Sequence, residues 1–230
     1  MRFPFLNWVG RHELAMLVLT MCVTGCAWAF ATITDRVFQG DTSGFDTRIL
    51  LSMRSADDPA DPIGPRWVEE LGRDFTALGG VGLLTLITIA VVGLLVLRDK
   101  RRTAAFVVVA IVGGVLLSTL LKMAVSRPRP DLVPHDSEVY TASFPSGHSL
   151  LSAVVYLTLG ALLAQVETSK RVKAYLIIVA MLLTFLVGMS RVYVGVHWPT
   201  DVLAGWTAGA AWATCCLVVW RWWNRRAAVM

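Results

Sequence analysis

Long apolar stretches alternate with short polar ones along this chain, and six of them have the length of a membrane span. They lie at 14–33, 75–97, 103–124, 147–166, 174–190 and 202–220. Crossing the roughly 30 Å hydrocarbon layer takes about 20 residues of helix, and backbone polar groups in lipid must be satisfied within the segment. The pattern therefore predicts an all-α polytopic membrane protein with six transmembrane helices, forming a single domain over residues 1–230. Gly205 and Gly209 predict a close helix contact within this bundle.

The composition supports this class of protein. Hydrophobic residues make up 56% of the 230 positions and charged residues only 16%, and the mean hydropathy is +0.62. Water-soluble domains carry more charge than this. The first apolar run continues past the small residues Ala29 and Ala31 as far as Ile33. We therefore expect an uncleaved span there rather than a signal peptide.

Charged residues divide unevenly between the two sides of the predicted bundle. One side carries the N-terminus, the loops 98–102 and 170–173 and the C-terminal tail, with twelve Lys and Arg against three acids. The other side carries nine Lys and Arg against thirteen acids. By the positive-inside rule the first side, with both termini, is cytoplasmic. The net charge of +5 thus reflects membrane topology, and we expect no nucleic-acid partner.

Residues 34–74 form the longest predicted segment outside the membrane, an acidic extracytoplasmic loop. Two short apolar patterns within it predict short interfacial helices. The first comprises Phe45, Ile49, Leu50 and Met53, and the second comprises Trp67, Leu71 and Phe75. We expect these helices to cover the end of the bundle rather than to gate the entry of a substrate.

Ionisable residues gather where the fifth apolar stretch ends and the sixth begins. Arg191, His197 and Asp201 fall within the twelve residues from Ser190 to Asp201. Ionisable groups at membrane depth are costly, so their presence indicates a functional site. The alternative is a Trp-Pro turn whose charged groups simply meet water at the membrane surface.

A second group of cations is predicted to reach the same side of the membrane. A helix from Arg102 to Lys122 rises about 30 Å at ~1.5 Å per residue, which places Lys122 at the extracytoplasmic end. Arg127 and Arg129 follow directly, next to prolines that stop the helix. Cations on the side that otherwise lacks them suggest an anionic ligand, although snorkelling toward lipid headgroups is the alternative.

A third polar cluster opens the fourth span, at Pro145-Ser146-Gly147-His148. Ser146 is a good N-cap, and Gly147 leaves room for an anion at the positive end of a helix. The sequence contains no HExxH, no cysteine ligand set and no acidic cage, so we expect no metal and no other cofactor. The implied ligand is a phosphate, and the implied chemistry is phosphoryl transfer through a histidine nucleophile.

Taken in order, the three clusters resemble the three-part signature of the type 2 phosphatidic acid phosphatase superfamily. The matching positions are Lys122 and Arg129-Pro130, then Pro145-Ser146-Gly147-His148, then Ser190-Arg191, His197 and Asp201. That superfamily includes lipid phosphate phosphatases, undecaprenyl pyrophosphate phosphatases, glucose-6-phosphatases and vanadium haloperoxidases. With the spans, the resemblance covers the chain from residue 75 onward, and Arg127 lies outside the signature.

The resemblance implies a role for each matching residue. His197 would be the nucleophile, Asp201 would orient its ring and stabilise the imidazolium, and His148 would act first as general acid and then as general base. The phosphate-binding residues would be Lys122, Arg129, Ser146, Gly147 and Arg191.

The function implied is metal-independent hydrolysis of a lipid phosphate monoester or pyrophosphate through a phosphohistidine. The site would face the extracytoplasmic side of a bacterial-type inner (plasma) membrane, and the partners would be the bilayer and the lipid substrate, with the oligomeric state left open. Undecaprenyl pyrophosphate, phosphatidylglycerol phosphate, phosphatidic acid and a lipid A phosphate all fit. The alternatives are hydrolysis of a soluble phosphate ester, a vanadium haloperoxidase, and a non-enzymatic anion transporter.

Overall fold

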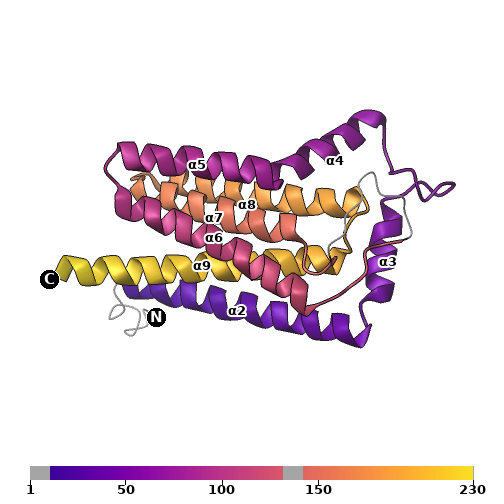
Figure 1. Cartoon of the computed structure of the whole chain (residues 1–230), viewed down its shortest axis with the longest axis horizontal. Helices are drawn as coiled ribbons and strands as arrows, with labels where there is room; N and C mark the ends of the chain where they lie inside the picture. The colour runs from indigo at the N-terminus through magenta and orange to yellow at the C-terminus, as the bar shows by residue number, and fades with distance from the viewer. Residues whose placement is uncertain (1–10, 132–141, 230) are drawn as a thin grey trace, which may run out of the picture.

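The computed structural model describes residues 11–131 and 142–229, and within them the regular elements are all helices (Figure 1). They are α2 (Arg11–Gln39), α3 (Ser43–Ser52), α4 (Arg66–Leu78), α5 (Val81–Leu97), α6 (Arg101–Ala124), α7 (Gly147–Val166), α8 (Lys170–Tyr193) and α9 (Pro199–Val229). In the described part of the chain, five helices are long and apolar enough to cross a membrane, and the bent pair α4–α5 makes a sixth candidate. The predicted all-helical bundle of membrane spans is confirmed.

The second predicted span, 75–97, is broken rather than continuous. α4 ends at Leu78 and α5 begins at Val81, with a bend of 49° between them. Gly79 and Gly80 form the break, as glycine commonly does at helix ends. A Cβ on Gly79 would lie 2.3 Å from a methyl group of Val187, so the chain can approach α8 this closely only without a side chain.

α7 is the central helix, and the contact that matters most for the site is the one it makes with α9. A Cβ on Gly205 would lie 2.7 Å from the carbonyl oxygen of Ser146, and one on Gly209 would lie 2.5 Å from that of Leu150. These two glycines let the first turns of α9 lie directly against the first turn of α7. The predicted contact through Gly205 and Gly209 is therefore confirmed as one within the bundle, and it brings two of the polar clusters together.

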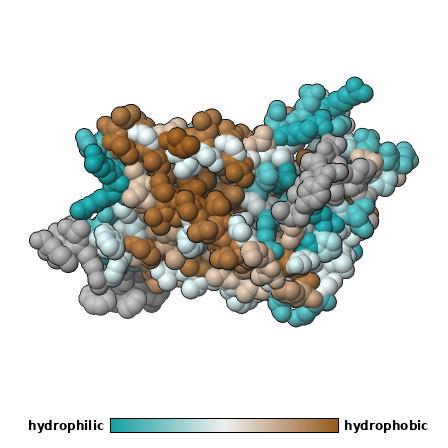
Figure 2. Space-filling model, in the orientation of Figure 1, coloured by the Kyte–Doolittle hydropathy of each residue, from teal (hydrophilic) through white to brown (hydrophobic). Residues whose placement is uncertain are grey.

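The two short helices lie at the end of the bundle opposite the start of α2 and the end of α9 (Figure 1). α3 crosses that end and buries Leu50 against Val192 and Val202. α4 packs on α8 through Gly72, while Trp67 on its other face is 62% exposed. Both predicted short helices are present and contact the bundle. A broad apolar surface with hydrophilic surfaces at both ends is visible in Figure 2.

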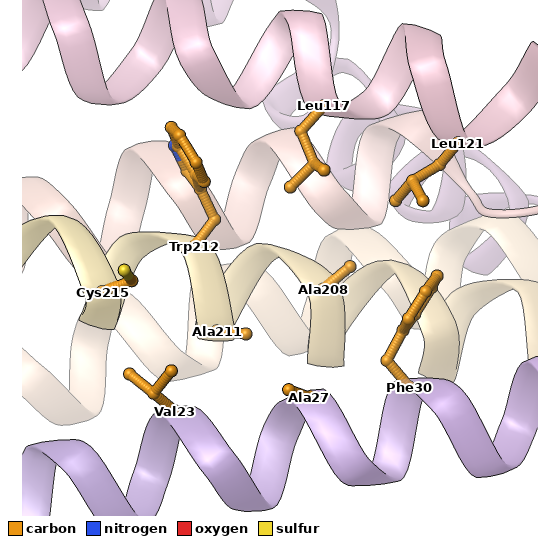
Figure 3. A pocket seen from close by; sticks show the side chains of 9 residues that line it. All are labelled: Val23, Ala27, Phe30, Leu117, Leu121, Ala208, Ala211, Trp212 and Cys215. Carbon is orange, nitrogen blue, oxygen red and sulfur yellow. The ribbon is translucent and has the colours of Figure 1, made fainter.

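One cavity among the helices is wholly apolar. It has a volume of about 260 Å³ and lies between α2, α6 and α9, with Val23, Phe30, Leu117 and Trp212 among its lining residues (Figure 3). It offers no charged group to a phosphate. The chemistry of this protein must therefore be sought elsewhere, at the polar end of the bundle.

Candidate active site

The end of α6 and the segment after it supply two cations. Lys122 lies in the last turn of α6, and its Nζ donates to the carbonyl oxygen of Ala142 at 2.8 Å. Beyond α6 the chain is extended, and Ser143 N–H donates to the carbonyl oxygen of Arg127 at 2.9 Å. Arg129 Nη1 donates to the carbonyl oxygen of Val196 at 2.7 Å. These bonds fix both cations next to the turn between α8 and α9.

The first turn of α7 supplies a second group of predicted site residues. Ser146 is the N-cap, as predicted, and its hydroxyl accepts from Ser149 N at 3.4 Å and from Ser149 Oγ at 2.9 Å. A Cβ on Gly147 would lie 3.4 Å from Cε of Lys122, so the glycine keeps the space beside this cation open. His148 follows on the cavity side of the same turn.

The turn from α8 to α9 presents His197 and Asp201. Gly195 has a φ of +80°, a conformation that favours glycine, and it allows the chain to reverse directly after α8. Pro199 begins α9, a position at which a backbone N–H would have no partner within the helix, so proline is well tolerated there. Two residues later Asp201 Oδ2 accepts from the backbone N–H of Trp198 at 3.0 Å, which satisfies a helix-start donor. The sequence HWPTD thus encodes both the turn and the carboxylate position.

The end of α6, the first turn of α7 and the turn between α8 and α9 surround a cavity of about 470 Å³. Its lining includes six of the eight predicted site residues: Lys122, Arg129, Gly147, His148, Arg191 and His197. Ser146 and Asp201 lie behind the lining, and both are fully buried. The three clusters, which are far apart in the sequence, are therefore brought together around one cavity.

His197 has one ring nitrogen toward the cations and the other toward the carboxylate. Its Nε2 lies 3.3 Å from Nη1 of Arg129, and its Nδ1 lies 3.5 Å from Oδ2 of Asp201. A proton on Nδ1 suits this arrangement because the carboxylate can only accept it. Nε2 then carries the lone pair on the cavity side, as a nucleophile requires.

Burial lowers the pKa of His197 to about 4, and the nearby Asp201 carboxylate opposes this by favouring the protonated form. Arg129 and Arg191 add to the lowering through their positive charge. The imidazole is therefore neutral, and its Nε2 unprotonated, throughout the physiological pH range.

This state can be checked by NMR titration of protein labelled with ¹³C-histidine in detergent. The Cε1 resonance of His197, assigned by its loss in His197→Asn, is expected to keep its neutral position down to mildly acidic pH and to titrate near pH 4. An exposed histidine titrates at about 6.5. A midpoint in that ordinary range would contradict the buried, neutral nucleophile.

Arg191 shows most directly what kind of ligand the cavity suits. Its side chain is only 8% exposed, and its Nε lacks a hydrogen-bond partner within the described residues. A buried guanidinium group with an unpaired donor is costly unless an anion meets it. Together with Lys122 and Arg129 it gives the cavity three cations, a set that suits the oxygens of a phosphate group.

The sequence interpretation missed several polar residues here. Ser143 is buried, and its Oγ donates to Oδ2 of Asp201 at 2.5 Å and lies 3.4 Å from Nδ1 of His197. Ser118 lines the cavity one helical turn before Lys122, a spacing that could have revealed it. Ser143 directly precedes the Phe-Pro-Ser-Gly-His segment, and nothing local in the sequence sets it apart.

Arg127 does not join the other two cations, contrary to the expectation of one cluster facing an anionic ligand. It is absent from the cavity lining and pairs with two carboxylates, Asp201 at 2.6 Å and Asp46 at 2.7 Å. Asp46 belongs to α3, in the loop that carried no predicted chemistry. Across residues 11–131 and 142–229, no three His, Cys, Asp or Glu side chains gather in a way that could hold a metal ion.

Comparison with known proteins gives matches over most of the chain. The sequence profile of the PAP2 superfamily matches residues 103–227. Phosphatidylglycerophosphatase B of Bacillus subtilis is 38% identical over 149 residues, covering 62% of this chain and 70% of that protein. The undecaprenyl-diphosphatase of Sulfolobus acidocaldarius is 32% identical over 125 residues, covering 51% and 55% of the two chains.

A solved structure also shares the fold. The crystal structure described as the first transmembrane PAP2 type phosphatidylglycerolphosphate phosphatase from Bacillus subtilis superposes with a TM-score of 0.70. It is 24% identical in sequence, and the match covers 88% of this chain and 96% of that one. The arrangement of helices described above is thus an arrangement already known for this type of membrane protein.

Proposed function

The chain belongs to the PAP2 superfamily of phosphatases, and from this premise we propose that it hydrolyses the phosphate monoester or pyrophosphate of a membrane lipid without a metal ion, through a phosphohistidine intermediate. The observation that carries the proposal is the convergence of three cations and two imidazoles on one cavity. The family accounts for phosphatase activity at a membrane. The lipid, the intermediate and the side of the membrane are the proposed parts.

In the first step, Nε2 of His197 attacks the phosphorus atom in line with the leaving oxygen. The new N–P bond forms as the P–O bond to the lipid breaks, and His148 gives its proton to the leaving oxygen. Lys122, Arg129 and Arg191 bind the three equatorial oxygens, where charge must be stabilised most. The negative charge of the bound phosphate favours the protonated form of His148, which is otherwise surrounded by cations.

In the second step, a water molecule attacks the phosphohistidine. His148, now neutral, takes a proton from this water, the N–P bond breaks, and inorganic phosphate leaves. The imidazolium character of His197 in the intermediate is stabilised by Asp201, because the proton on Nδ1 faces the carboxylate. Ser146 and Gly147 are proposed to add hydrogen bonds to the phosphate at the start of α7.

The cavity wall between α5 and α6 supports a lipid as the substrate. Val81 of α5 and Val115 of α6 both line the cavity, and they are 65% and 43% exposed. These apolar side chains line a cavity that holds charged groups and are also exposed at the outer surface. This arrangement suits a lipid whose headgroup enters the cavity while its acyl or isoprenoid chain stays in the bilayer.

The extracytoplasmic location rests on charge. The basic loops before α6 and before α8 lie at the same end of the bundle as the start of α2 and the end of α9 (Figure 1). The cavity is lined by residues from the start of α5, the end of α6, the start of α7 and the turn between α8 and α9, and these segments lie toward the other end. Because short loops rich in Lys and Arg are retained in the cytoplasm, we propose that the cavity opens on the opposite side. The substrate would then be drawn from the outer leaflet.

The proposal predicts phosphate release from lipids in the presence of EDTA. Purified protein in vesicles is expected to release inorganic phosphate from at least one of phosphatidylglycerol phosphate, phosphatidic acid and undecaprenyl pyrophosphate, with no loss of rate on chelation. The named relatives act on a glycerolipid and on an isoprenoid, which is why both classes belong in the panel. Phosphate assay by colour formation is the measurement.

Three other results would each contradict a separate part of the proposal. A rate that falls with EDTA and returns with Mg²⁺ would contradict metal independence. Hydrolysis confined to soluble esters would contradict the lipid substrate. Uptake of labelled phosphate into vesicles without any hydrolysis would identify an anion transporter instead of an enzyme.

A further inference from the structure

Arg127 forms the centre of a buried polar cluster on the side of Asp201 that faces away from His197. Its Nη1 donates to Oδ1 of Asp201 at 2.6 Å and to Oγ1 of Thr200 at 2.8 Å. Its Nη2 donates to Oδ2 of Asp46 at 2.7 Å. We call these four residues the Arg127 cluster. One guanidinium group therefore bridges two carboxylates that are far apart in the sequence, Asp46 of α3 and Asp201 of α9.

Asp46 also holds the first turn of α9. Its Oδ1 accepts from the backbone N–H of Thr200 at 2.9 Å, and its Oδ2 accepts from Thr200 Oγ1 at 2.7 Å. A carboxylate that accepts from a backbone N–H at a helix start acts as a cap, and here the cap comes from another helix. The residue after Thr200 is Asp201, so α3 fixes the piece of backbone that carries this carboxylate.

Hydrogen bonding also fixes the charges in the cluster. Asp46 and Asp201 are completely buried, and within residues 11–131 and 142–229 their carboxylate oxygens accept hydrogen bonds from donors. Acceptor-only behaviour is that of ionised carboxylates, so the cluster holds two negative charges and one positive charge. Without Asp46, the charge of Arg127 would cancel that of Asp201. With Asp46 present, the cluster keeps one net negative charge. Oδ2 of Asp201 is the atom of the cluster that lies next to His197, 3.5 Å from its Nδ1.

We propose that Asp46 and Arg127 are positioning residues of the reaction: they hold the Asp201 carboxylate beneath His197 and preserve its negative charge for the imidazolium that forms there. This inference rests on the proposed function, because it assigns the cluster to stabilising the phosphohistidine. It gives the loop between α2 and α5 a part in catalysis without any contact to the substrate. A purely structural fastening of α3 to the bundle is the competing explanation.

Four variants separate these explanations: Asp46→Asn, Arg127→Gln, the double variant, and Asp41→Asn as a matched control on an exposed acid of the same loop. The cluster charge is −1 in the native protein, 0 in Asp46→Asn, −2 in Arg127→Gln, and −1 again in the double variant. Asp46→Asn and the double variant leave no like charges buried together, so their comparison decides the matter if Arg127→Gln fails to fold.

In Asp46→Asn we expect kcat for lipid phosphate to fall about a hundredfold, the scale of a misplaced catalytic group, with KM little changed. KM should hold because Lys122, Arg129 and Arg191 are untouched. The double variant is expected to recover a substantial part of kcat relative to Asp46→Asn, since its charge is restored. Asp41→Asn should match the native protein.

Two results would overturn the proposal. If Asp46→Asn lowers only the melting temperature and keeps its kcat, the cluster is a structural fastening. If the double variant is slower than both single variants, charge balance is not what the cluster supplies.

A readout independent of turnover keeps this test distinct from that of the proposed function. The protonation midpoint of His197, followed by ¹³C NMR, is expected to move to lower pH in Asp46→Asn and back toward the native value in the double variant. All variants share the charged or titratable groups around His197, which are Lys122, Arg129, His148 and Arg191 on the cavity side and Asp201 behind the ring. If the native protein releases no phosphate from any lipid, the proposed function fails while this measurement still decides the cluster, and an unchanged midpoint in Asp46→Asn refutes it.

Discussion

Replacing His197 by alanine is expected to lower phosphate release by at least about 10⁴-fold, because removing the nucleophile of a covalent mechanism costs this much or more. The protein should nevertheless fold. Asp201 would lose one neighbour but keep three donors, namely Ser143 Oγ, the backbone N–H of Trp198 and the guanidinium group of Arg127. The measurement is the initial rate of phosphate release from the best lipid of the panel.

Two further measurements on His197→Ala test separately whether the protein folds and whether it forms a covalent intermediate. Size-exclusion profiles and melting temperatures should match those of the native protein. With substrate labelled by ³²P and an alkaline quench, under which phosphohistidine survives, the native protein should carry label and His197→Ala should carry none. Near-normal turnover, or label that persists in the variant, would show that the nucleophile lies elsewhere.

Replacing His148 by asparagine is expected to separate the two halves of the reaction. On a lipid substrate, whose alkoxide leaving group needs a proton, kcat should fall by about 10²–10⁴-fold, the usual contribution of general acid–base catalysis. With p-nitrophenyl phosphate the leaving group departs without a proton, so His197 should still be phosphorylated quickly. Hydrolysis of the intermediate still needs a base, and the phosphohistidine should therefore accumulate.

Stopped-flow absorbance gives the measurement for His148→Asn. We expect a burst of p-nitrophenolate approaching one equivalent per enzyme, followed by a slow steady rate. His148→Asn combined with His197→Ala serves as the control and should show no burst. If the single variant slows aryl and lipid substrates equally and accumulates no phosphoenzyme, His148 is a binding group rather than the proton carrier.

The sequence predicted the helical elements well because the causes are local. Apolar runs of membrane length must be helical in lipid, and prolines and capping residues such as Pro199 and Ser146 act on their own neighbours along the chain. The prediction of one continuous span over 75–97 was wrong at Gly79-Gly80, because the hydrophobic run continues after these glycines and the apolar pattern does not show the break. The break lies at these two adjacent glycines, and the lack of a side chain on Gly79 lets the chain lie against Val187 of another helix.

The candidate site was also largely visible in the sequence. Lys122, His148 and His197 each stand out because ionisable groups are rare at membrane depth, and the spacing between them matches a family signature. Their convergence was a prediction, and all three residues line one cavity of the structure. The packing of α9 on α7 through Gly205 and Gly209 brings the segments of His148 and His197 together, and the end of α6 adds Lys122. Their roles in the reaction stay predictions, to be decided by the variants described above.

What the sequence by itself determined is therefore the approximate position of the spans, the starts of α7 and α9, and the set of ionisable residues that are candidates for the site. Only the tertiary structure decided that Arg127 belongs with carboxylates rather than with Arg129, and that Asp46 reaches the start of α9. No local feature separates Asp46 from the exposed Asp41 on the same loop. The reason is physical: the partner of a buried charge depends on how helices that are distant in the sequence pack together. The residues next to that charge in the sequence do not determine this packing.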